Sequence, residues 1–585
     1  MPYRPHRRTF VKSLAALGVV GGTGLWRQPG WASSLPGAGL IELSGQVFDL
    51  VIDATAVTVG GERRQALTIN GGLPGPLLRW REGDTVTVRV HNRLAEPTSL
   101  HWHGILLPAN MDGVPGLSFH GIAPGETFEY RFKVRQHGTY WYHSHSGFQE
   151  QVGVYGPLVI EPSVADQPRV AEQVLMLTDW TDQNPERIYA RLKKEPGYYN
   201  QNPRTLGDFF HDAGQQGLGA TLRERWMWAR MRMDPTDLAD VSAQAYTYLV
   251  NGQAPDDNFT RLFTPGEPLR LRFINGSAMT YFDVRIPGLK MTVIAADGQP
   301  VEPVEVDEFR LAVAETLDVL VRPDSTDAYT VFAQSMDRSG YARATLASRA
   351  GLAAPVPPLD APVVLGMMDM GMGMGEKGME GMNHGATSDS AHGTMANMTH
   401  GDHGAMPATL AAPAHKPSEQ GNPLVDMQAT APSPRLADPG IGLRNNGRRV
   451  LTYADLRSTS PDPDGREPSR TLELHLTGHM DKFVWAFDGI EASEAAPIRL
   501  RYGERVRIVL VNDTMMAHPI HLHGMWSDLE DEDGRFLVRK HTIDVPPGTR
   551  RSYRVSADAL GRWAYHCHML YHMEAGMFRE VRVDE

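Results

Sequence analysis

The stretch GDTVTVRVHN (Gly83–Asn92) recurs twice more in the chain, as GEPLRLRFIN (Gly266–Asn275) and GERVRIVLVN (Gly503–Asn512). Each copy begins with glycine, continues with alternating apolar and polar residues, and ends in asparagine. Alternation with period two is typical of a β-strand that buries one face. The copies start 183 and 237 residues apart, which predicts three related β-domains with additional sequence before the third.

The composition is that of a globular protein with several cores. Of the 585 residues, 41% are hydrophobic and 22% are charged, which excludes disorder throughout. Many short predicted strands, separated by turns rich in Gly and Pro, indicate an all-β protein of β-sandwiches or Greek-key barrels. We expect domains at residues 45–165, 170–350 and 445–585. The insert at about 185–239 is less strand-like and is expected to contain short helices.

The N-terminus has the features of an export signal. Arg7-Arg8 precedes Phe10 and Lys12, and an apolar run of 14 residues follows from Ser13 to Trp26. A membrane-spanning helix needs about 20 apolar residues, so this run is too short to span a bilayer. The pattern resembles a twin-arginine signal, and we expect residues 1–32 to be removed. A disordered basic N-terminus is the alternative.

Charge and cysteine usage narrow the classes of partner. The net charge is −12, and loss of the basic signal makes it more negative, which argues against nucleic acid and anionic membrane surfaces as partners. Cys567 is the only cysteine and therefore forms no internal disulfide. In an oxidising compartment such a thiol has to be buried, paired with another chain or bound to a metal.

The composition changes between the second and third predicted domains, at residues 351–440. Residues 367–406 hold ten of the 27 methionines, interleaved with glycine, together with His384, His392, His400 and His403. No helical or strand period would bury these methionines, so the Met-rich linker is predicted to be disordered without a ligand. Thioethers are soft ligands that select Cu(I). A flexible linker in which Met is incidental is the alternative.

The first and third repeat copies are each followed by two His-X-His pairs. The two pairs lie 42 residues apart after the first copy and 45 after the third, in the same order. Because the two frames are homologous, we expect the eight imidazoles to converge between these domains and to hold several first-row metal ions. The pairs are His101/His103 and His143/His145, then His521/His523 and His566/His568. The middle copy has no such pair.

A second set of ligand residues surrounds the single cysteine. Cys567 is accompanied by His518, His572 and Met577. Two histidines, one thiolate and a weakly bound methionine form the ligand set of blue copper. Zinc also accepts Cys and His, but it prefers a closed tetrahedral site of nitrogen and sulfur donors and rarely takes Met, so copper is favoured. As a metal-bound thiolate, the cysteine would be protected from oxidation.

Together these motifs resemble those of the multicopper oxidases, and the resemblance covers nearly the whole chain after the signal. It rests on HWHG (101–104), HSH (143–145), HPIHLHG (518–524) and HCHMLYHMEAGM (566–577). The twin-arginine pattern, the Met-rich linker and the methionines at 227, 231 and 233 resemble the copper resistance protein A group of Gram-negative periplasms. The resemblance implies three cupredoxin-like domains, the second without copper, four copper ions and a periplasmic location.

The resemblance also implies a role for each ligand residue. The type 1 copper ligands would be His518, Cys567, His572 and Met577, and the type 2 ligands would be His101 and His521. The type 3 pair would be held by His103, His143, His145, His523, His566 and His568.

Two acidic residues are candidates for proton delivery. Asp112 stands where relatives keep an acid with this role, although an aspartate beside glycine is also a common turn residue. Many relatives have an acid directly after the histidine equivalent to His572. Here Met573 occupies that position and Glu574 follows, so we hypothesise that Glu574 takes over the role.

The function implied is an oxidase that couples oxidation of Cu(I) to four-electron reduction of O2 to water, in copper resistance. Its expected partners are O2, Cu(I) or another one-electron donor, and other copper-handling proteins; a monomer without a membrane span is expected. The candidate Cu(I)-binding residues are Met227, Met231, Met233, Met370, Met372 and Met374. A laccase-like phenol oxidase and non-enzymatic copper sequestration by the Met-rich linker are the alternatives.

Overall fold

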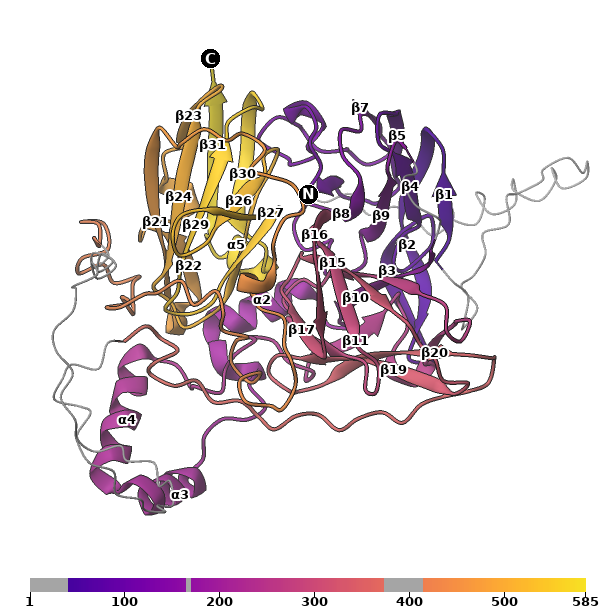
Figure 1. Cartoon of the computed structure of the whole chain (residues 1–585). Coiled ribbons are helices and arrows are strands. Elements are labelled where there is room, and N and C mark those ends of the chain that lie inside the picture. Colours follow the sequence, from indigo (N-terminus) through magenta and orange to yellow (C-terminus); the bar gives the residue numbers. More distant parts are fainter. Residues whose placement is uncertain (1–39, 165–169, 373–413) are drawn as a thin grey trace, which may run out of the picture. The chain divides into compact units, whose positions relative to one another are not determined.

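The computed structural model describes residues 40–164, 170–372 and 414–585, and their strands form six sheets (Figure 1). Two sheets belong to each of three successive parts of the chain, so the predicted all-β architecture of three related two-sheet domains is confirmed. The predicted signal at 1–32 lies outside the described residues. So do residues 373–413, in the middle of the predicted Met-rich linker.

The first domain consists of a five-stranded sheet in the order β1-β4-β9-β8-β6 and a four-stranded sheet in the order β3-β2-β5-β7. In the second sheet β5 pairs in parallel with β2 and antiparallel with β7. Residues 86, 88 and 90 of β5 are fully buried and alternate with more exposed ones, as predicted for the first repeat copy. The strands are β1 (Glu42–Ser44), β2 (Val47–Val59), β3 (Glu62–Ile69), β4 (Leu77–Arg81), β5 (Thr85–Asn92), β6 (His101–His103), β7 (Thr127–Lys133), β8 (Gly138–His143) and β9 (Tyr155–Glu161).

The second domain repeats this arrangement in the sheets β11-β10-β13-β18-β15-β16 and β12-β20-β19-β14-β17. The second repeat copy forms β13, which again lies between a parallel strand, β10, and an antiparallel strand, β18. The strands are β10 (Ala171–Trp180), β11 (Thr247–Val250), β12 (Phe259–Leu262), β13 (Leu269–Asn275), β14 (Phe282–Arg285), β15 (Met291–Ala296), β16 (Gln299–Val306), β17 (Glu308–Leu311), β18 (Thr316–Val321), β19 (Ala328–Ser335) and β20 (Tyr341–Ala347).

Strand β13 differs from the half-buried strand predicted for it, because almost all of it is buried. On the face expected to be exposed, the Arg272 guanidinium donates to Thr139 Oγ1 on β8 at 2.8 Å and to Asp318 at 3.0 Å. The first domain therefore covers this face. Alternation in a single sequence cannot reveal a surface buried against another domain.

The insert between β10 and β11 is helical, as predicted. It contains α2 (Pro185–Lys194), α3 (Leu206–Gln216) and α4 (Leu218–Met231), and Figure 1 shows α3 and α4 as two successive helices. Asn184 caps α2 through its side chain, and Thr205 caps α3 in a capping box with Asp208. Across the described ranges, no helix combines the length and the apolar character needed to cross a membrane.

The third domain has the sheets β22-β21-β24-β29-β26-β27 and β23-β31-β30-β25-β28. The third repeat copy forms β24, between parallel β21 and antiparallel β29. The elements are β21 (Arg470–His479), β22 (Val484–Phe487), β23 (Ile498–Arg501), β24 (Arg505–Asn512), β25 (His518–Leu522), β26 (Ser527–Glu530), β27 (Phe536–Lys540), β28 (Thr542–Val545), β29 (Arg550–Ser556), β30 (Gly561–Cys567), α5 (Leu570–Glu574) and β31 (Phe578–Asp584).

The asparagine that ends each repeat copy makes the same hydrogen bonds in all three domains. Its buried side-chain amide donates to two carbonyl groups, and its side-chain oxygen accepts from the amide two residues later. The carbonyls are those of Glu96 and Ile122 for Asn92, Thr280 and Leu311 for Asn275, and Met516 and Val545 for Asn512. These bonds satisfy buried backbone groups where the strand ends, which explains why the repeat ends in asparagine.

The two described ends of the 351–440 segment pack onto the domains. Met370 is fully buried, and the Gly371 carbonyl accepts a hydrogen bond of 2.8 Å from the Ala431 amide. The Arg435 guanidinium donates to the Asp369 carbonyl at 3.1 Å. The prediction of disorder is therefore wrong for these two ends. The sequence could not show their packing, because the pairing joins residues that are distant from each other along the chain.

Candidate metal centre

The strands place the four His-X-His pairs at matching positions in the first and third domains. His101 on β6 lies opposite His143 at the end of β8. His521 on β25 lies opposite His566 on β30 in the same antiparallel register. The repeated fold therefore presents two equivalent histidine pairs on neighbouring strands of each domain.

The eight imidazoles converge as the sequence predicted, and six of them separate into two groups of three. His103, His143 and His568 form one group, and His145, His523 and His566 form the other. In the first, the Nε2 atoms of His143 and His568 are 3.4 Å apart. In the second, His566 Nε2 is 3.3 Å from His145 Nε2 and 3.1 Å from His523 Nε2. Each group combines residues from both domains.

Several imidazoles hold their proton on the nitrogen that faces away from the group. His566 Nδ1 donates to the Cys567 carbonyl at 2.9 Å, and His523 Nδ1 donates to Asp112 Oδ2 at 2.8 Å. Their Nε2 atoms then carry lone pairs only, and they face each other at 3.1 Å. Two lone pairs at this distance repel unless a cation lies between them, so the donor set fits a metal ion.

His101 and His521 show the same fit. His101 Nδ1 donates to the Asp112 carbonyl at 2.9 Å, and His521 Nδ1 donates to the His541 carbonyl at 2.6 Å. The Nε2 atom of each ring is buried without a hydrogen-bond partner. Buried polar atoms are rarely left unsatisfied, so both are positioned as ligand atoms.

Burial keeps the six histidines of the two groups of three neutral, as metal ligands must be. It lowers the pKa of His566 to about 3 and the pKa of His568 well below its ordinary value. Neighbouring imidazoles lower the pKa of His568 further, because a second positive charge would be unfavourable. A protonated imidazole has no free lone pair, so the depressed pKa values keep the rings competent to bind metal.

A separate group lies around Cys567. Its Sγ atom is 3.6 Å from His518 Nδ1 and 3.8 Å from His572 Nδ1, and the two Nδ1 atoms are 3.1 Å apart. His518 comes from β25, Cys567 ends β30 and His572 lies on α5. Met577, predicted as the fourth ligand, is fully buried, and its backbone carbonyl accepts a hydrogen bond from the Cys567 amide at 3.1 Å.

The outer nitrogens of both histidines in this group are held by other residues. Thr514 Oγ1 lies 2.7 Å from His518 Nε2, and Asp240 Oδ2 accepts from His572 Nε2 at 2.8 Å. These contacts direct both Nδ1 atoms toward Cys567. Asp240 belongs to the second domain, far from His572 in the sequence, and no motif around it indicated this contact.

The environment of Cys567 favours a metal-bound thiolate over a free one. The side chain is fully buried, and burial raises the pKa of its thiol well above the ordinary value. An isolated thiolate would be strongly disfavoured in this position. A bound cation reverses the balance by stabilising the negative sulfur.

Comparisons with known proteins agree with this geometry. Models of the multicopper oxidase family match residues 51–165, 171–351 and 465–585. The chain belongs to the multicopper oxidase family. Membership makes it an oxidase with copper as cofactor, and it confirms the resemblance found in the sequence.

Two relatives match over the full length of both chains. The chain is 66% identical over 601 residues to a copper resistance protein A homolog of Pseudomonas syringae pv. tomato. It is 62% identical over 614 residues to copper resistance protein A of Escherichia coli. The crystal structure of Fet3p, a multicopper oxidase that functions in iron import, has the same fold, with a TM-score of 0.63 at 19% identity, covering 93% of this chain and 91% of that one.

The two predicted acids of this multicopper oxidase differ in their surroundings. Asp112 is buried between two histidines, with Oδ2 2.8 Å from His523 Nδ1 and Oδ1 3.3 Å from His101 Nδ1. Glu574 is exposed, and the structure records no side-chain hydrogen bond or ion pair between it and the described histidines. The sequence missed a third acid, Glu150, whose Oε2 atom is 2.7 Å from His143 Nδ1.

Two neighbouring cavities are lined by some of these acids together with residues of the histidine groups. An inner cavity of about 10 Å³, room for about one water molecule, is lined by His143, His566 and Glu150. An outer cavity of about 480 Å³ is lined by Tyr189, Lys193 and Glu574. His145, Gly147 and Met573 line both. In this chain the acid stands one residue later than in many relatives. As a result Met573 lies where the two cavities meet, and Glu574 lies in the outer cavity.

The predicted Cu(I)-binding methionines separate by exposure. Met231, Met233 and Met370 are buried in the hydrophobic core. Met227 on α4 is 38% exposed and Met372 is partly buried, while Met374 lies outside the described residues. Among the five of these six candidates that lie in the described residues, Met227 offers the most accessible thioether.

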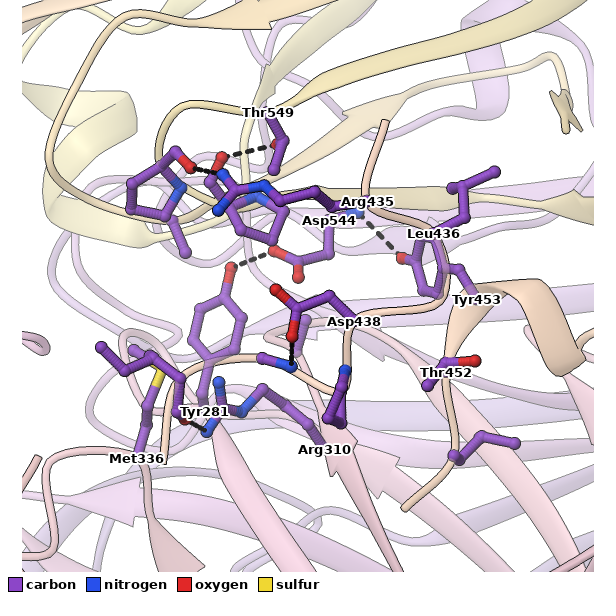
Figure 2. Close-up of a pocket in the computed structure, with 18 of the residues that line it drawn as sticks. Tyr281, Arg310, Met336, Arg435, Leu436, Asp438, Thr452, Tyr453, Asp544 and Thr549 are labelled. Carbon is purple, nitrogen blue, oxygen red and sulfur yellow. Dashed lines mark hydrogen bonds between the residues drawn. The ribbon is translucent and has the colours of Figure 1, made fainter. Parts of the chain in front are cut away.

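Another pocket of this multicopper oxidase, of about 110 Å³, contains none of the predicted copper ligands. Figure 2 shows Tyr281 and Asp544 pointing toward each other inside it, joined by a hydrogen bond of 2.8 Å. Asp438 on its wall pairs with Arg444. These polar side chains satisfy one another, so we assign the pocket no part in the copper chemistry.

Proposed function

We propose that the protein is a periplasmic multicopper oxidase that oxidises Cu(I), reduces O2 to water by four electrons and so contributes to copper resistance. Four copper ions are proposed. The group at Cys567 would hold type 1 copper with Met577 as its weak ligand, and His101 with His521 would hold type 2 copper. The two groups of three histidines would hold the type 3 pair. When bound, copper supplies one-electron exchange with a donor and the reduction of O2.

The observation that carries this proposal is the position of Cys567 between two members of the histidine groups. His566 belongs to one group of three and His568 to the other. The protein backbone therefore connects the sulfur ligand directly to both groups. Burial of all three residues excludes bulk water from this connection.

Proton delivery is proposed for acids that touch the histidine groups. Asp112 accepts from His523 Nδ1 and lies beside His101 Nδ1, so it is placed to orient these two rings and to pass protons between the His523 group and the His101/His521 pair. Glu150 contacts His143 in the inner cavity. Glu574, in the outer cavity, is in a position to exchange protons with solvent.

Cu(I) is proposed as donor because two full-length relatives are named for copper resistance and because the chain concentrates soft methionine ligands between its second and third domains. The exposed Met227 is the proposed entry point on the described surface. Periplasmic location is supported by the twin-arginine pattern at Arg7-Arg8.

The donor is tested by comparing turnover with Cu(I) and with a phenol. The variants are the wild type, a chain lacking residues 373–406, and Met227→Leu. Met231→Leu is the matched control, because it changes a buried methionine on the same helix. We expect both the deletion and Met227→Leu to slow Cu(I) turnover and to leave phenol turnover unchanged. Equal Cu(I) turnover in all four proteins would refute the proposed Cu(I) entry, and faster phenol turnover would favour a laccase-like activity.

Sequestration is tested by Cys567→Ser in cells. An oxidase predicts that blue absorption, O2 consumption and copper tolerance are lost together. Sequestration by methionine and histidine would leave tolerance intact, because the substitution removes none of those ligands from the Met-rich linker.

A further inference from the structure

Four side chains outside the histidine groups described above converge on one point in the third domain. They are His415, Glu419, His475 and Asp513, and we call them the 415/475 cluster. One ligand atom from each lies within 4.8 Å of the others. His475 is on β21 and Asp513 directly follows β24, whereas His415 and Glu419 come from the chain just before the third domain.

The distances within the 415/475 cluster match those around a small ion. His415 Nδ1 is 3.1 Å from Glu419 Oε2 and 3.4 Å from Asp513 Oδ2. His475 Nδ1 is 3.5 Å from Glu419 Oε2 and 2.6 Å from Asp513 Oδ2. In a tetrahedral zinc site with bonds of about 2.0–2.1 Å, neighbouring ligand atoms are about 3.4 Å apart. Three of the four separations are close to this value.

The remaining polar atoms of the cluster are oriented by neighbours. Asp513 Oδ1 accepts from the Ala429 amide at 2.7 Å, and Glu419 Oε1 accepts from the Lys416 amide at 3.4 Å. Each carboxylate therefore directs its other oxygen to the centre. His475 Nε2 lies 3.5 Å from Glu473 Oε1, which gives the carboxylate–histidine arrangement that commonly supports a metal-bound imidazole.

The charge of the cluster requires a cation. The side chains of Glu419 and Asp513 are 0% exposed, and among the described residues neither pairs with a lysine or arginine. Two buried carboxylates this close together are costly without compensation. Burial is the largest single influence and lowers the pKa of His475, but the hydrogen bond with Asp513 and the negative charges of Asp513 and Glu419 together outweigh it and leave the pKa raised. A protonated His475 is therefore the arrangement that competes with a metal ion.

We propose that the 415/475 cluster binds one divalent first-row metal ion, Zn²⁺ or Cu²⁺, through two imidazoles and two carboxylates. Two neutral imidazoles and two carboxylates balance the charge of a divalent ion. The set contains no sulfur, so it does not select Cu(I). The ion would fasten the chain around His415 and Glu419 to β21 and to the end of β24. Thr514, next to Asp513, contacts the His518 ring, so the site lies close to the cysteine-containing group.

The test measures metal uptake by the copper-loaded protein. His384, His392, His400 and His403 are replaced by alanine throughout, so that residues 367–406 contribute no histidine ligands. Wild type in this background is compared with His415→Ala, which removes a partly exposed ligand outside the sheets, and with Glu419→Gln, which keeps the side-chain shape. His137→Ala is the matched control, because His137 pairs with a single carboxylate, Glu82, at 3.2 Å. Unchanged blue absorption reports that each variant is folded.

Equilibrium dialysis with Zn²⁺, Cu²⁺ or chelator-buffered Cu(I) is followed by metal counting. We expect one Zn²⁺ or Cu²⁺ bound per chain with release of about one proton, and Cu²⁺ binding more tightly than Zn²⁺. His415→Ala and Glu419→Gln should weaken divalent binding by at least about tenfold, and His137→Ala should have no effect. Equal divalent uptake by all four proteins, or a loss confined to Cu(I), would overturn the proposal.

Discussion

The first and third domains have the same backbone arrangement but different side chains at three equivalent positions. In the third domain, His518, Cys567 and His572 converge with Nδ1 and Sγ atoms 3.1–3.8 Å apart. The equivalent positions in the first domain are Thr98, Ser144 and Gln149. They also converge, because Gln149 Oε1 accepts from Thr98 Oγ1 at 2.6 Å and from Ser144 Oγ at 3.0 Å.

The backbone is equivalent as well. The Ser144 amide donates to the Val154 carbonyl at 2.8 Å, and the Cys567 amide donates to the Met577 carbonyl at 3.1 Å, ten residues along the chain in both cases. The fold thus builds the same pocket in both domains. A hydrogen-bonded network of uncharged side chains fills it in one, and a soft ligand set fills it in the other. The difference teaches that the side chains, and not the fold, decide which domain carries a soft ligand set.

Cys567→Ser should produce the largest effect, because it converts the third-domain pocket toward the first-domain one. A hydroxyl cannot replace a thiolate as a soft ligand, so blue absorption should disappear and O2 consumption should fall below about 1% of wild type. The histidine groups remain intact, so their copper should stay bound. A variant that keeps its blue colour would contradict the assignment of Cys567.

The next largest effect is expected at Glu150. This acid follows Ser144 in the first domain, whereas the equivalent position after Cys567 in the third domain carries no acid. Glu150→Gln keeps a hydrogen-bond acceptor for His143 but removes the acidic proton, so O2 consumption should fall by about tenfold to a hundredfold. Glu574→Gln changes an exposed side chain and should alter the rate by less than about twofold. Steady-state O2 uptake at several pH values measures both, and the reverse order of effects would show that the outer acid controls proton delivery.

Substitution of Asp240 tests the support that the third-domain pocket receives from the second domain. Asp240→Ala leaves His572 Nε2 without its acceptor and should weaken copper binding at the cysteine site by about tenfold. Asp240→Asn retains an acceptor oxygen and should restore most of that affinity. Copper retention during dialysis against a chelator, followed by blue absorption, separates the two variants. Identical retention in both would mean that Asp240 does not position the ring.

Gln149→Ala is expected to have the smallest effect and to act on stability alone. It removes the acceptor shared by the buried Thr98 and Ser144 hydroxyls, and leaving such groups unsatisfied costs about 1–3 kcal/mol. Thermal unfolding should therefore shift downward while blue absorption stays unchanged. Loss of the blue signal in this variant would show that the two pockets depend on each other.

The sequence was sufficient for the fold and for the convergence of the histidines. Strand alternation at Gly83–Asn92 and its two copies predicted three β-domains, and the duplicated His-X-His spacing predicted which side chains would meet. Both signals are local sequence patterns that recur in the same order and with nearly the same spacing. The sequence also placed Cys567, His518 and His572 together, because their residue types match one known ligand set.

Contacts between distant parts of the chain could not be predicted in the same way. Some residues contact a proposed ligand or a strand although no sequence motif surrounds them. They are Asp240, Glu150 and the members of the 415/475 cluster. Burial of β13 depends on Thr139 of another domain, and burial of Met370 depends on pairing between the two ends of the segment that follows the second domain. Such contacts arise from packing between domains, which leaves no period or spacing in a single sequence.

The central claim is that Cys567 joins one copper site to a separate group of three copper ions. The most direct measurement is an integrated electron spin resonance spectrum of the oxidised protein, recorded after removal of loosely bound copper and compared with total copper. The account predicts one blue Cu(II) signal and one non-blue Cu(II) signal per chain, with about two further copper ions that give no signal. A single type of signal, or a blue signal that survives Cys567→Ser, would contradict it.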